Sequence, residues 1–203
     1  MQTFWNERYT AAEYAYGEAP NEWLKEQLST LRPGRILLPA EGEGRNGVFA
    51  ATLGWEVNAF DISAAGKDKA LKLAQKQGVQ IDYFVGSFGD IQYAPESFDA
   101  IALIFAHFPP AFRQQWHRQL GQLLRPGGLI LLEAFTPRQL VFNTNNPAAG
   151  GPRELPLLFT AGMIAEDFEG FEVMLAEETD TVLDEGPFHQ GTGAVLRFIA
   201  KKP

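Results

Sequence analysis

From residue 35 onward, short apolar runs alternate with longer amphipathic stretches, and this alternation constrains the fold more than any other feature of the chain. The amphipathic stretches predict helices at 46–53, 64–77 and 110–124. Strands that alternate with helices are typical of βαβ units, which build a parallel sheet with helices on its faces. The apolar runs predict five strands, at 36–40, 56–60, 81–85, 100–105 and 129–135.

The end of the chain departs from this alternation. A Pro- and Gly-rich stretch at 137–156 predicts a loop at the active-site end of the sheet, and a short helix is expected at 160–168. Two long strands at 171–183 and 194–201 are joined by so short a connection that they must be antiparallel. We therefore expect an α/β fold with a Rossmann-like, seven-stranded, mostly parallel sheet that ends in an antiparallel hairpin.

The start of the chain has a helical pattern. Segments 4–16 and 20–31 show helical periodicity and predict an N-terminal helical cap over residues 1–31, ahead of a core over residues 35–203. A chain of 203 residues is too short for two ordinary catalytic domains. We therefore expect one domain that spans the whole chain, 1–203.

Composition narrows the class of partner. Hydrophobic residues make up 45% of the chain, and no apolar run approaches the roughly 20 residues that span a bilayer, so we expect a soluble protein without a membrane partner. The net charge of −8 repels phosphate backbones, which disfavours nucleic acid. The first residues do not resemble a secretion signal, there is no cysteine, and the three histidines lack metal-ligand spacing. These observations predict a cytoplasmic protein without a metal that acts on a small molecule, and they leave its oligomeric state open.

The strongest local signal is a glycine-rich turn, Glu-Gly-Glu-Gly-Arg-Asn-Gly at 41–47, between the first core strand and the following helix. Gly42 and Gly44 permit positive φ and let a ligand approach the backbone. Ligands of open α/β sheets bind beyond the carboxyl ends of the strands, and the N–H groups of the following helix favour a carboxylate or phosphate. Asp61 ends the next strand, where its carboxylate can accept the hydrogen bonds of a ribose diol.

Two classes of cofactor share this layout. Gly42, Gly44 and Gly47 match the Gly-x-Gly-x-x-Gly dinucleotide fingerprint, so an NAD(P)-binding reductase remains an alternative. Three observations oppose it. The chain has no room for a separate substrate domain, no tyrosine is followed four positions later by lysine, and a terminal antiparallel hairpin suits a methyltransferase sheet better.

Several segments resemble a known family. They are Trp-Asn-Glu-Arg-Tyr at 5–9, the turn at 41–46, Ile-Phe-Ala-His-Phe-Pro at 104–109, Leu-Arg-Pro-Gly-Gly at 124–128 and Glu-Gly-Pro-Phe-His at 185–189. Together they are similar to the class I S-adenosylmethionine-dependent methyltransferases near the tellurite-resistance and thiopurine methyltransferases. The resemblance covers nearly the whole chain. It implies S-adenosylmethionine as the cofactor but is unspecific for the methyl acceptor, for which we expect a small heteroatom nucleophile such as tellurite or a thiol.

The same resemblance implies the cofactor site. The turn would hold the methionyl part of the cofactor, Asp61 the ribose, and Ser87 with Phe88 the adenine, while His107 would lie near the methyl donor. Leu38, Ala40 and Ser87 depart from the usual family pattern, which leaves a non-catalytic S-adenosylmethionine binder as a further alternative. The candidate cofactor-binding residues are Glu41, Gly42, Glu43, Gly44, Arg45, Asn46, Asp61, Ile62, Ser87, Phe88, Phe105, Ala106, His107 and Tyr16.

The candidate residues for binding and activating the methyl acceptor follow from side-chain chemistry. His107, at the end of a buried strand, and His189, in the hairpin turn, are the candidate catalytic residues, although methyl transfer needs alignment first and a base only if the nucleophile carries a proton. The glycines and proline beside His189 predict a mobile or exposed side chain. His117 lies mid-helix among polar residues and is expected on the surface. The candidate substrate-binding residues are His189, Arg138, Arg153 and Tyr9.

Overall fold

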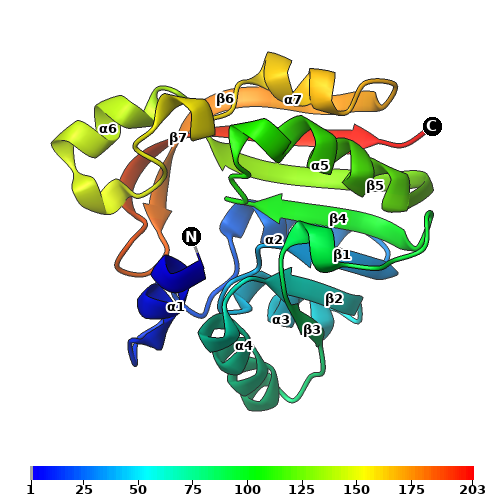
Figure 1. Ribbon diagram of the computed structural model, residues 1–203, viewed down its shortest axis with the longest axis horizontal. Coiled ribbons are helices and arrows are strands. Elements are labelled where there is room, and N and C mark those ends of the chain that lie inside the picture. Colours follow the sequence, from blue (N-terminus) through cyan, green and yellow to red (C-terminus); the bar gives the residue numbers. More distant parts are fainter. Residues whose placement is uncertain (1) are drawn as a thin grey trace.

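The computed structural model describes residues 2–203, and its centre is a seven-stranded sheet in the order β3-β2-β1-β4-β5-β7-β6 (Figure 1). The first five strands pair in parallel, and β7 runs antiparallel to both β5 and β6. The predicted fold class is thus confirmed. The strands are β1 (Arg35–Pro39), β2 (Glu56–Asp61), β3 (Asp82–Val85), β4 (Phe98–Ile104), β5 (Leu124–Phe135), β6 (Glu172–Asp184) and β7 (Gln190–Lys201).

Helices cover both faces of the sheet (Figure 1). On one face α2, α3 and α4 bury a cluster that includes Trp23, Leu24 and Ala70 against β1 and β2. On the other face α5 and α7 bury Leu120 and Ile164 against β4, β5 and β7. The helices are α1 (Gln2–Thr10), α2 (Glu22–Thr30), α3 (Arg45–Thr52), α4 (Ala64–Gln77), α5 (Pro110–Leu123), α6 (Gln139–Asn145) and α7 (Ala161–Asp167), with short 3₁₀ turns η1 (Phe88–Asp90), η2 (Pro147–Ala149) and η3 (Leu155–Leu157).

Capping chemistry explains why α4 has the bounds predicted from the sequence. The hydroxyl of Ser63 accepts a hydrogen bond from the backbone N–H of Gly66 at 3.1 Å, which satisfies one of the free amides of the first turn. Gly78 follows the last helical residue with φ +70°, the left-handed conformation that ends helices. No helix within residues 2–203 is both long and apolar enough to cross a membrane.

Three predicted boundaries are wrong. The first cap helix ends at Thr10 rather than at 16, and β5 begins at Leu124 rather than at 129 because Leu124 already pairs with Phe98 before a register shift. The predicted loop at 137–156 contains α6 and η2. A buried glutamine, Gln139, anchors α6 by donating to the carbonyl of Gly150 at 2.9 Å and accepting from the backbone N–H of Ala194 at 2.8 Å. A tertiary contact of this kind has no signal in the local composition.

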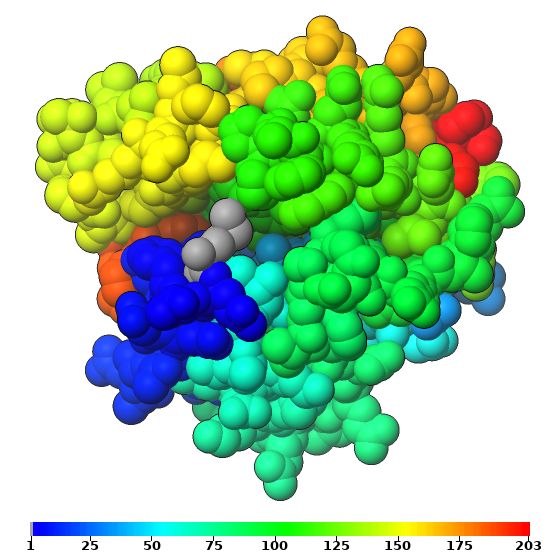
Figure 2. Space-filling model, viewed as in Figure 1, coloured from blue at the N-terminus to red at the C-terminus, as the bar shows by residue number. Residues whose placement is uncertain are grey.

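The carboxyl ends of β1, β2 and β4 meet at one edge of the sheet, next to α1 and to the connection between β6 and β7 (Figure 1). Figure 2 shows the molecular surface hollowed on this face, between the blue helix α1, the green region around α5 and the yellow segment that follows α6. We call residues 11–21, which link α1 to α2, the strap.

Candidate cofactor and acceptor site

The two leading glycines of the turn have positive φ, as predicted, with +61° at Gly42 and +88° at Gly44. The space beside them is filled by protein, however. A Cβ on Gly44 would overlap the Cβ of Ala70 in α4, and a Cβ on Gly42 would lie 2.6 Å from the hydroxyl of Tyr9. The expectation that both bare positions leave room for a ligand is therefore wrong. These glycines let α4 and α1 pack closely on the turn, and Tyr9, predicted to contact substrate, is buried there.

The carboxylate of Glu41 lies at the N-terminus of α3. Its Oε1 accepts the backbone N–H of Gly47 at 2.6 Å, and burial raises the pKa of Glu41 to about 7 against the opposing effect of these amides and of Arg45. The chain thus places its own carboxyl group at the helix terminus that the sequence suggested for a ligand. A dinucleotide pyrophosphate would place further negative charge on the same helix terminus, which disfavours the reductase alternative.

Glu43 and Asn46 use their side chains to hold the strap. One oxygen of Glu43 accepts the backbone N–H of Ala15 at 2.7 Å, and the other pairs with Lys69 of α4 at 2.7 Å. The side-chain oxygen of Asn46 accepts the backbone N–H of Asn21 at 2.9 Å. These predicted cofactor residues therefore fasten the strap and α4 to the turn.

One terminal nitrogen of the Arg45 guanidinium is hydrogen-bonded, and the other is not. Its Nη2 donates to Oε2 of Glu185 at 2.8 Å, whereas the buried Nη1 has no hydrogen-bond partner within residues 2–203. The residue is only 7% exposed, and an unpaired buried donor of a charged group is costly. A carboxylate, such as that of the methionyl group of S-adenosylmethionine, would satisfy it. The residues at the turn therefore fit this cofactor.

Asp61 lies where the ribose prediction requires it. Its two oxygens accept the backbone N–H groups of Ser63 at 2.8 Å and Gly42 at 3.2 Å, while burial raises its pKa to about 6. Each carboxylate oxygen has a second lone pair, so two acceptor positions remain. The neighbouring Ile62 contributes its carbonyl to a hydrogen bond from Gln2 at 3.0 Å.

The two residues assigned to adenine are partly committed to the protein. The hydroxyl of Ser87 donates to Asp90 at 2.6 Å, within a capping box at the start of η1. The ring of Phe88 is buried and stacks on Trp116 with centroids 5.2 Å apart, while its edge meets Phe60. The ring of Phe88 therefore packs mainly into the core, rather than presenting an open face.

His107 has both ring nitrogens occupied. Nδ1 lies 2.7 Å from the carbonyl oxygen of Leu157, to which it donates, and Nε2 accepts the backbone N–H of Phe135 at 3.2 Å. Burial lowers the pKa of His107 to about 4, so the ring stays neutral. No nitrogen is left to move a proton, and the predicted catalytic role is not supported. His107 instead joins the segment after α6 to the sheet, directly after Phe105 and Ala106, where a positive φ of 53° at Phe105 ends β4.

His189 is buried, with 4% of its surface exposed, so the expectation of a mobile or exposed side chain is wrong. Its Nδ1 lies 3.1 Å from Oε2 of Glu185. The ring packs against Tyr16 and Phe105, with centroids 4.5 and 4.6 Å away. Burial lowers the pKa of His189, and Glu185 opposes that shift.

The sequence reasoning missed Arg8, although the residue lies in one of the segments that carry the family resemblance. Its guanidinium donates to the hydroxyl of Tyr16 at 3.0 Å and lies 4.0 Å from the ring centroid of Phe188, at the tip of the hairpin. No ion pair from Arg8 to a carboxylate is found within residues 2–203. Its position between α1, the strap and the hairpin could have been inferred only from the fold.

Known proteins that resemble this chain give independent information about its family. Residues 36–128 match the model of a methyltransferase domain family. The ubiquinone/menaquinone biosynthesis C-methyltransferase UbiE of Geotalea daltonii is 31% identical over 115 residues, which cover 54% of this chain. They cover 49% of that protein, so the chain matches about half the length of its curated relative. Over residues 36–128 this chain is therefore similar to methyltransferase domains, and this similarity supports S-adenosylmethionine as its cofactor.

Solved structures share the fold of this chain. TehB from Haemophilus influenzae superposes with a TM-score of 0.72 and 15% identity, over 100% of this chain and 67% of that one. A protein studied for the conversion of a disulfide bond into a thioacetal group during echinomycin biosynthesis gives 0.75 and 19%, over 98% and 89%. The predicted family and its cofactor class are confirmed, whereas the predicted acceptors remain untested.

The fold does not gather the other predicted substrate residues around His189. Arg138 pairs with Asp180 at 2.8 Å on the surface, where 66% of its side chain is exposed, and Arg153 is also exposed. His117, expected on the surface, is fully buried because α7 covers it, and its Nδ1 lies 2.7 Å from Asp167. Within residues 2–203 no group of three potential ligands could hold a metal ion.

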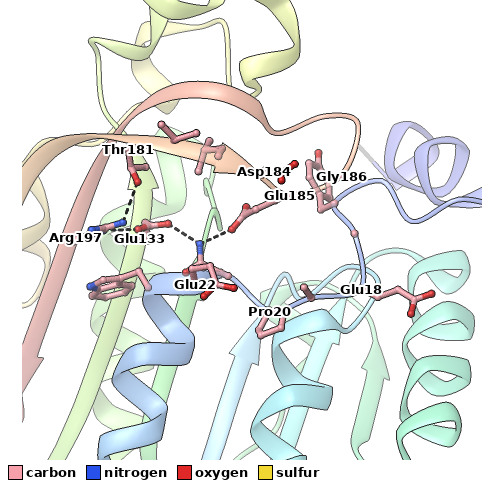
Figure 3. A pocket seen from close by; sticks show the side chains of 16 residues that line it. Glu18, Pro20, Glu22, Glu133, Thr181, Asp184, Glu185, Gly186 and Arg197 are labelled. Atoms are coloured by element: carbon pink, nitrogen blue, oxygen red, sulfur yellow. Dashed lines mark hydrogen bonds and ion pairs between the residues drawn. The ribbon is translucent and has the colours of Figure 1, made fainter.

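A separate cavity of about 340 Å³ lies between the strap and the β6–β7 hairpin (Figure 3). The amide of Asn21 donates to Glu133 at 2.7 Å and to Glu185 at 2.9 Å, and Arg197 donates to Glu133 at 2.7 Å (Figure 3). Glu185 is therefore shared between the lining of this cavity and the environment of His189. Sequence reasoning missed Asn21, Glu133 and Glu185, since their contacts join segments far apart in the chain.

Proposed function

We propose that this chain transfers the methyl group of S-adenosylmethionine to a small-molecule acceptor. The position of Glu41 carries the proposal, because its carboxylate occupies the helix terminus that a dinucleotide would need and leaves the turn suited to a cofactor without phosphate. The uncommitted Nη1 of Arg45 and the remaining lone pairs of Asp61 support it.

The proposed roles of the residues follow from their contacts. Arg45 would hold the methionyl carboxylate, with Arg8 as a second cation nearby, and Asp61 would accept the ribose hydroxyls. S-adenosylmethionine supplies a methyl group activated by a sulfonium. The chain would align the acceptor with that methyl group and exclude water, and alignment alone can supply roughly 7–11 kcal/mol of the barrier.

We propose a heteroatom nucleophile, such as a thiol or an inorganic oxyanion like tellurite, as the acceptor. The curated relative is named as a C-methyltransferase, so a carbon acceptor belongs in any test panel.

Calorimetric titration tests the cofactor. S-adenosylmethionine and its demethylated product should each bind with a dissociation constant of roughly micromolar order, whereas NADH should not bind. Arg45→Gln should weaken cofactor binding. Arg125→Gln, which removes an ion pair with Asp99 at the opposite edge of the sheet, is the matched control and should not. Saturable binding of NADH, or no binding of either cofactor form below about millimolar, would refute the proposal.

A further inference from the structure

Glu185 joins three separate parts of the molecule at the connection between β6 and β7. Its Oε2 accepts from Arg45 of the turn at 2.8 Å and lies 3.1 Å from Nδ1 of His189. Its Oε1 accepts from Asn21 of the strap at 2.9 Å. Burial acts to raise the pKa of Glu185, but the hydrogen bond from His189 and the charge of Arg45 lower it to about 2. The carboxylate is therefore ionised at neutral pH.

An ionised carboxylate only accepts hydrogen bonds, so the proton of a neutral His189 ring must lie on Nδ1. Nε2 then carries a bare lone pair. No hydrogen-bond partner for Nε2 is found within residues 2–203. The rings of Tyr16, Phe105 and Phe135 surround the imidazole, with centroids 4.5, 4.6 and 5.3 Å away, and fix its orientation.

Gly150 packs closely against the Nε2 edge of the ring, where a larger residue would not fit. A Cβ at this position would overlap Cδ2 of His189 and lie 3.1 Å from Nε2. Gly150 has φ +79° and follows η2, in the segment that borders the hollow of Figure 2. His107 has no equivalent freedom, because both of its nitrogens already have partners.

The charged and titratable groups that face His189 are Glu185, Tyr16, Arg45 and Arg8. Glu185 favours the protonated ring, whereas burial and the two arginines oppose protonation and lower the pKa of His189. Tyr16 is neutral, since burial raises its pKa. The ring is therefore ready to accept a proton at neutral pH, with a carboxylate in place to stabilise the imidazolium that results.

We propose that Glu185 is a positioning residue that holds His189 with Nε2 free to take a proton, so that among the heteroatom nucleophiles proposed above this site favours a protic one, such as a thiol, an alcohol or a phenol, over an oxyanion or a tertiary amine. This inference rests on the proposed methyl transfer. The attacking atom of the acceptor forms a bond to the methyl carbon, and the bond between that carbon and sulfur breaks with its electron pair on sulfur. The proton of the acceptor passes to Nε2 and then to water.

The test compares two kinds of acceptor. Catechol and mercaptoethanol carry a proton on the attacking atom, whereas selenite and nicotinamide do not. Glu185→Gln should lower kcat for the first pair by about 10²-fold, as expected when a positioned base is lost, and should alter the acidic limb of the pH–rate profile. Glu185→Asp should restore part of the loss. Glu177→Gln, on the exposed face of β6, is the matched control and should leave all rates unchanged.

Two measurements keep this inference separate from the proposed function. Calorimetry with the demethylated cofactor is made on the wild type, and failure of the wild type to bind would refute the proposed function itself. Because Glu185 also pairs with Arg45, the rates of Glu185→Gln are compared between acceptors at saturating cofactor. Nitrogen NMR of labelled histidine needs no acceptor, and it should show Nε2 of His189 unprotonated in the wild type. A proton on Nε2, or an equal loss of rate for both kinds of acceptor in Glu185→Gln, would overturn the inference.

Discussion

The carboxyl ends of β1 and β2 and the segment from 137 to 160 form two sides of the same site, but they are held in different ways. On the first side, carboxylates bind backbone amides a few residues away, as Glu41 binds Gly47 and Asp61 binds Ser63. On the second side, single long-range contacts fix the chain, such as His107 to Leu157.

This difference separates contacts that follow from the course of the chain from contacts that depend on single side chains. Contacts to backbone amides tolerate few substitutions, because the amide positions follow from the course of the chain itself. Contacts made by one side chain can be exchanged without rebuilding a strand. We infer that the first side is specialised for the cofactor and that the second side can vary with the acceptor.

The largest expected effect comes from Gly44→Ala on the cofactor side. Overlap with Ala70 and the positive φ together should cost about 3–5 kcal/mol of unfolding free energy. Gly78→Ala has a positive φ as well but no atom within 4 Å, so it should cost only about 1 kcal/mol. Urea unfolding measures both. Equal losses for the two variants would show that close packing on the turn does not matter.

The second largest expected effect is a change of unfolding free energy with pH that comes from Glu41. Burial raises its folded-state pKa to about 7, above the ordinary value of 4.5, so between these values the folded protein holds a proton that the unfolded chain has lost. The stability contributed by this group is therefore present below about pH 4.5 and falls as pH rises to 7. Relative to wild type, Glu41→Gln should gain up to about 3 kcal/mol over that range. A constant difference between the two proteins at all pH values would contradict this.

His107→Leu tests the second side. It leaves the carbonyl of Leu157 and the N–H of Phe135 unpaired, which should cost about 2 kcal/mol. His107→Gln keeps the ability to make one of the bonds and should lose less. Hydrogen exchange should increase mainly around 147–157 while affinity for the demethylated cofactor stays unchanged. Loss of cofactor binding in a folded variant would mean that the two sides are not independent.

The smallest expected effect is that of Arg138→Ala. Its ion pair with Asp180 is exposed, so unfolding free energy should change by less than about 1 kcal/mol and less still in high salt. Denaturant titration at two salt concentrations measures this. Because stability is spared, a fall in methyl transfer by this variant would support the predicted contact with substrate, and Asp180→Ala is the control for loss of the ion pair alone.

Sequence patterns predicted the parts of the fold whose causes are local. Ser63 and Gly78 mark the ends of α4, and alternating apolar runs predict the five parallel strands. The glycine turn and Asp61 were found for the same reason, since their positions follow from one βαβ unit.

The remaining features depend on contacts between distant segments. His117 was expected on the surface because its neighbours are polar, yet Asp167, 50 residues later, covers and binds it. The hydrogen bond between Gln139 and Ala194 stabilises helix α6 in a segment that was expected to be a loop. Glu185 pairs with Arg45, which lies 140 residues earlier in the chain. Periodicity within a short window carries no signal of such partners.

The order of strands in the sheet also has a consequence for how the protein is made. β7 follows β6 in the chain, yet it lies between β5 and β6. Until β7 has been synthesised, β6 has no partner strand in the sheet. The β6–β7 hairpin and the cavity that it borders can therefore form only after β7 has left the ribosome, and the acidic residues along β6 help to keep its unpaired edge from aggregating in the meantime.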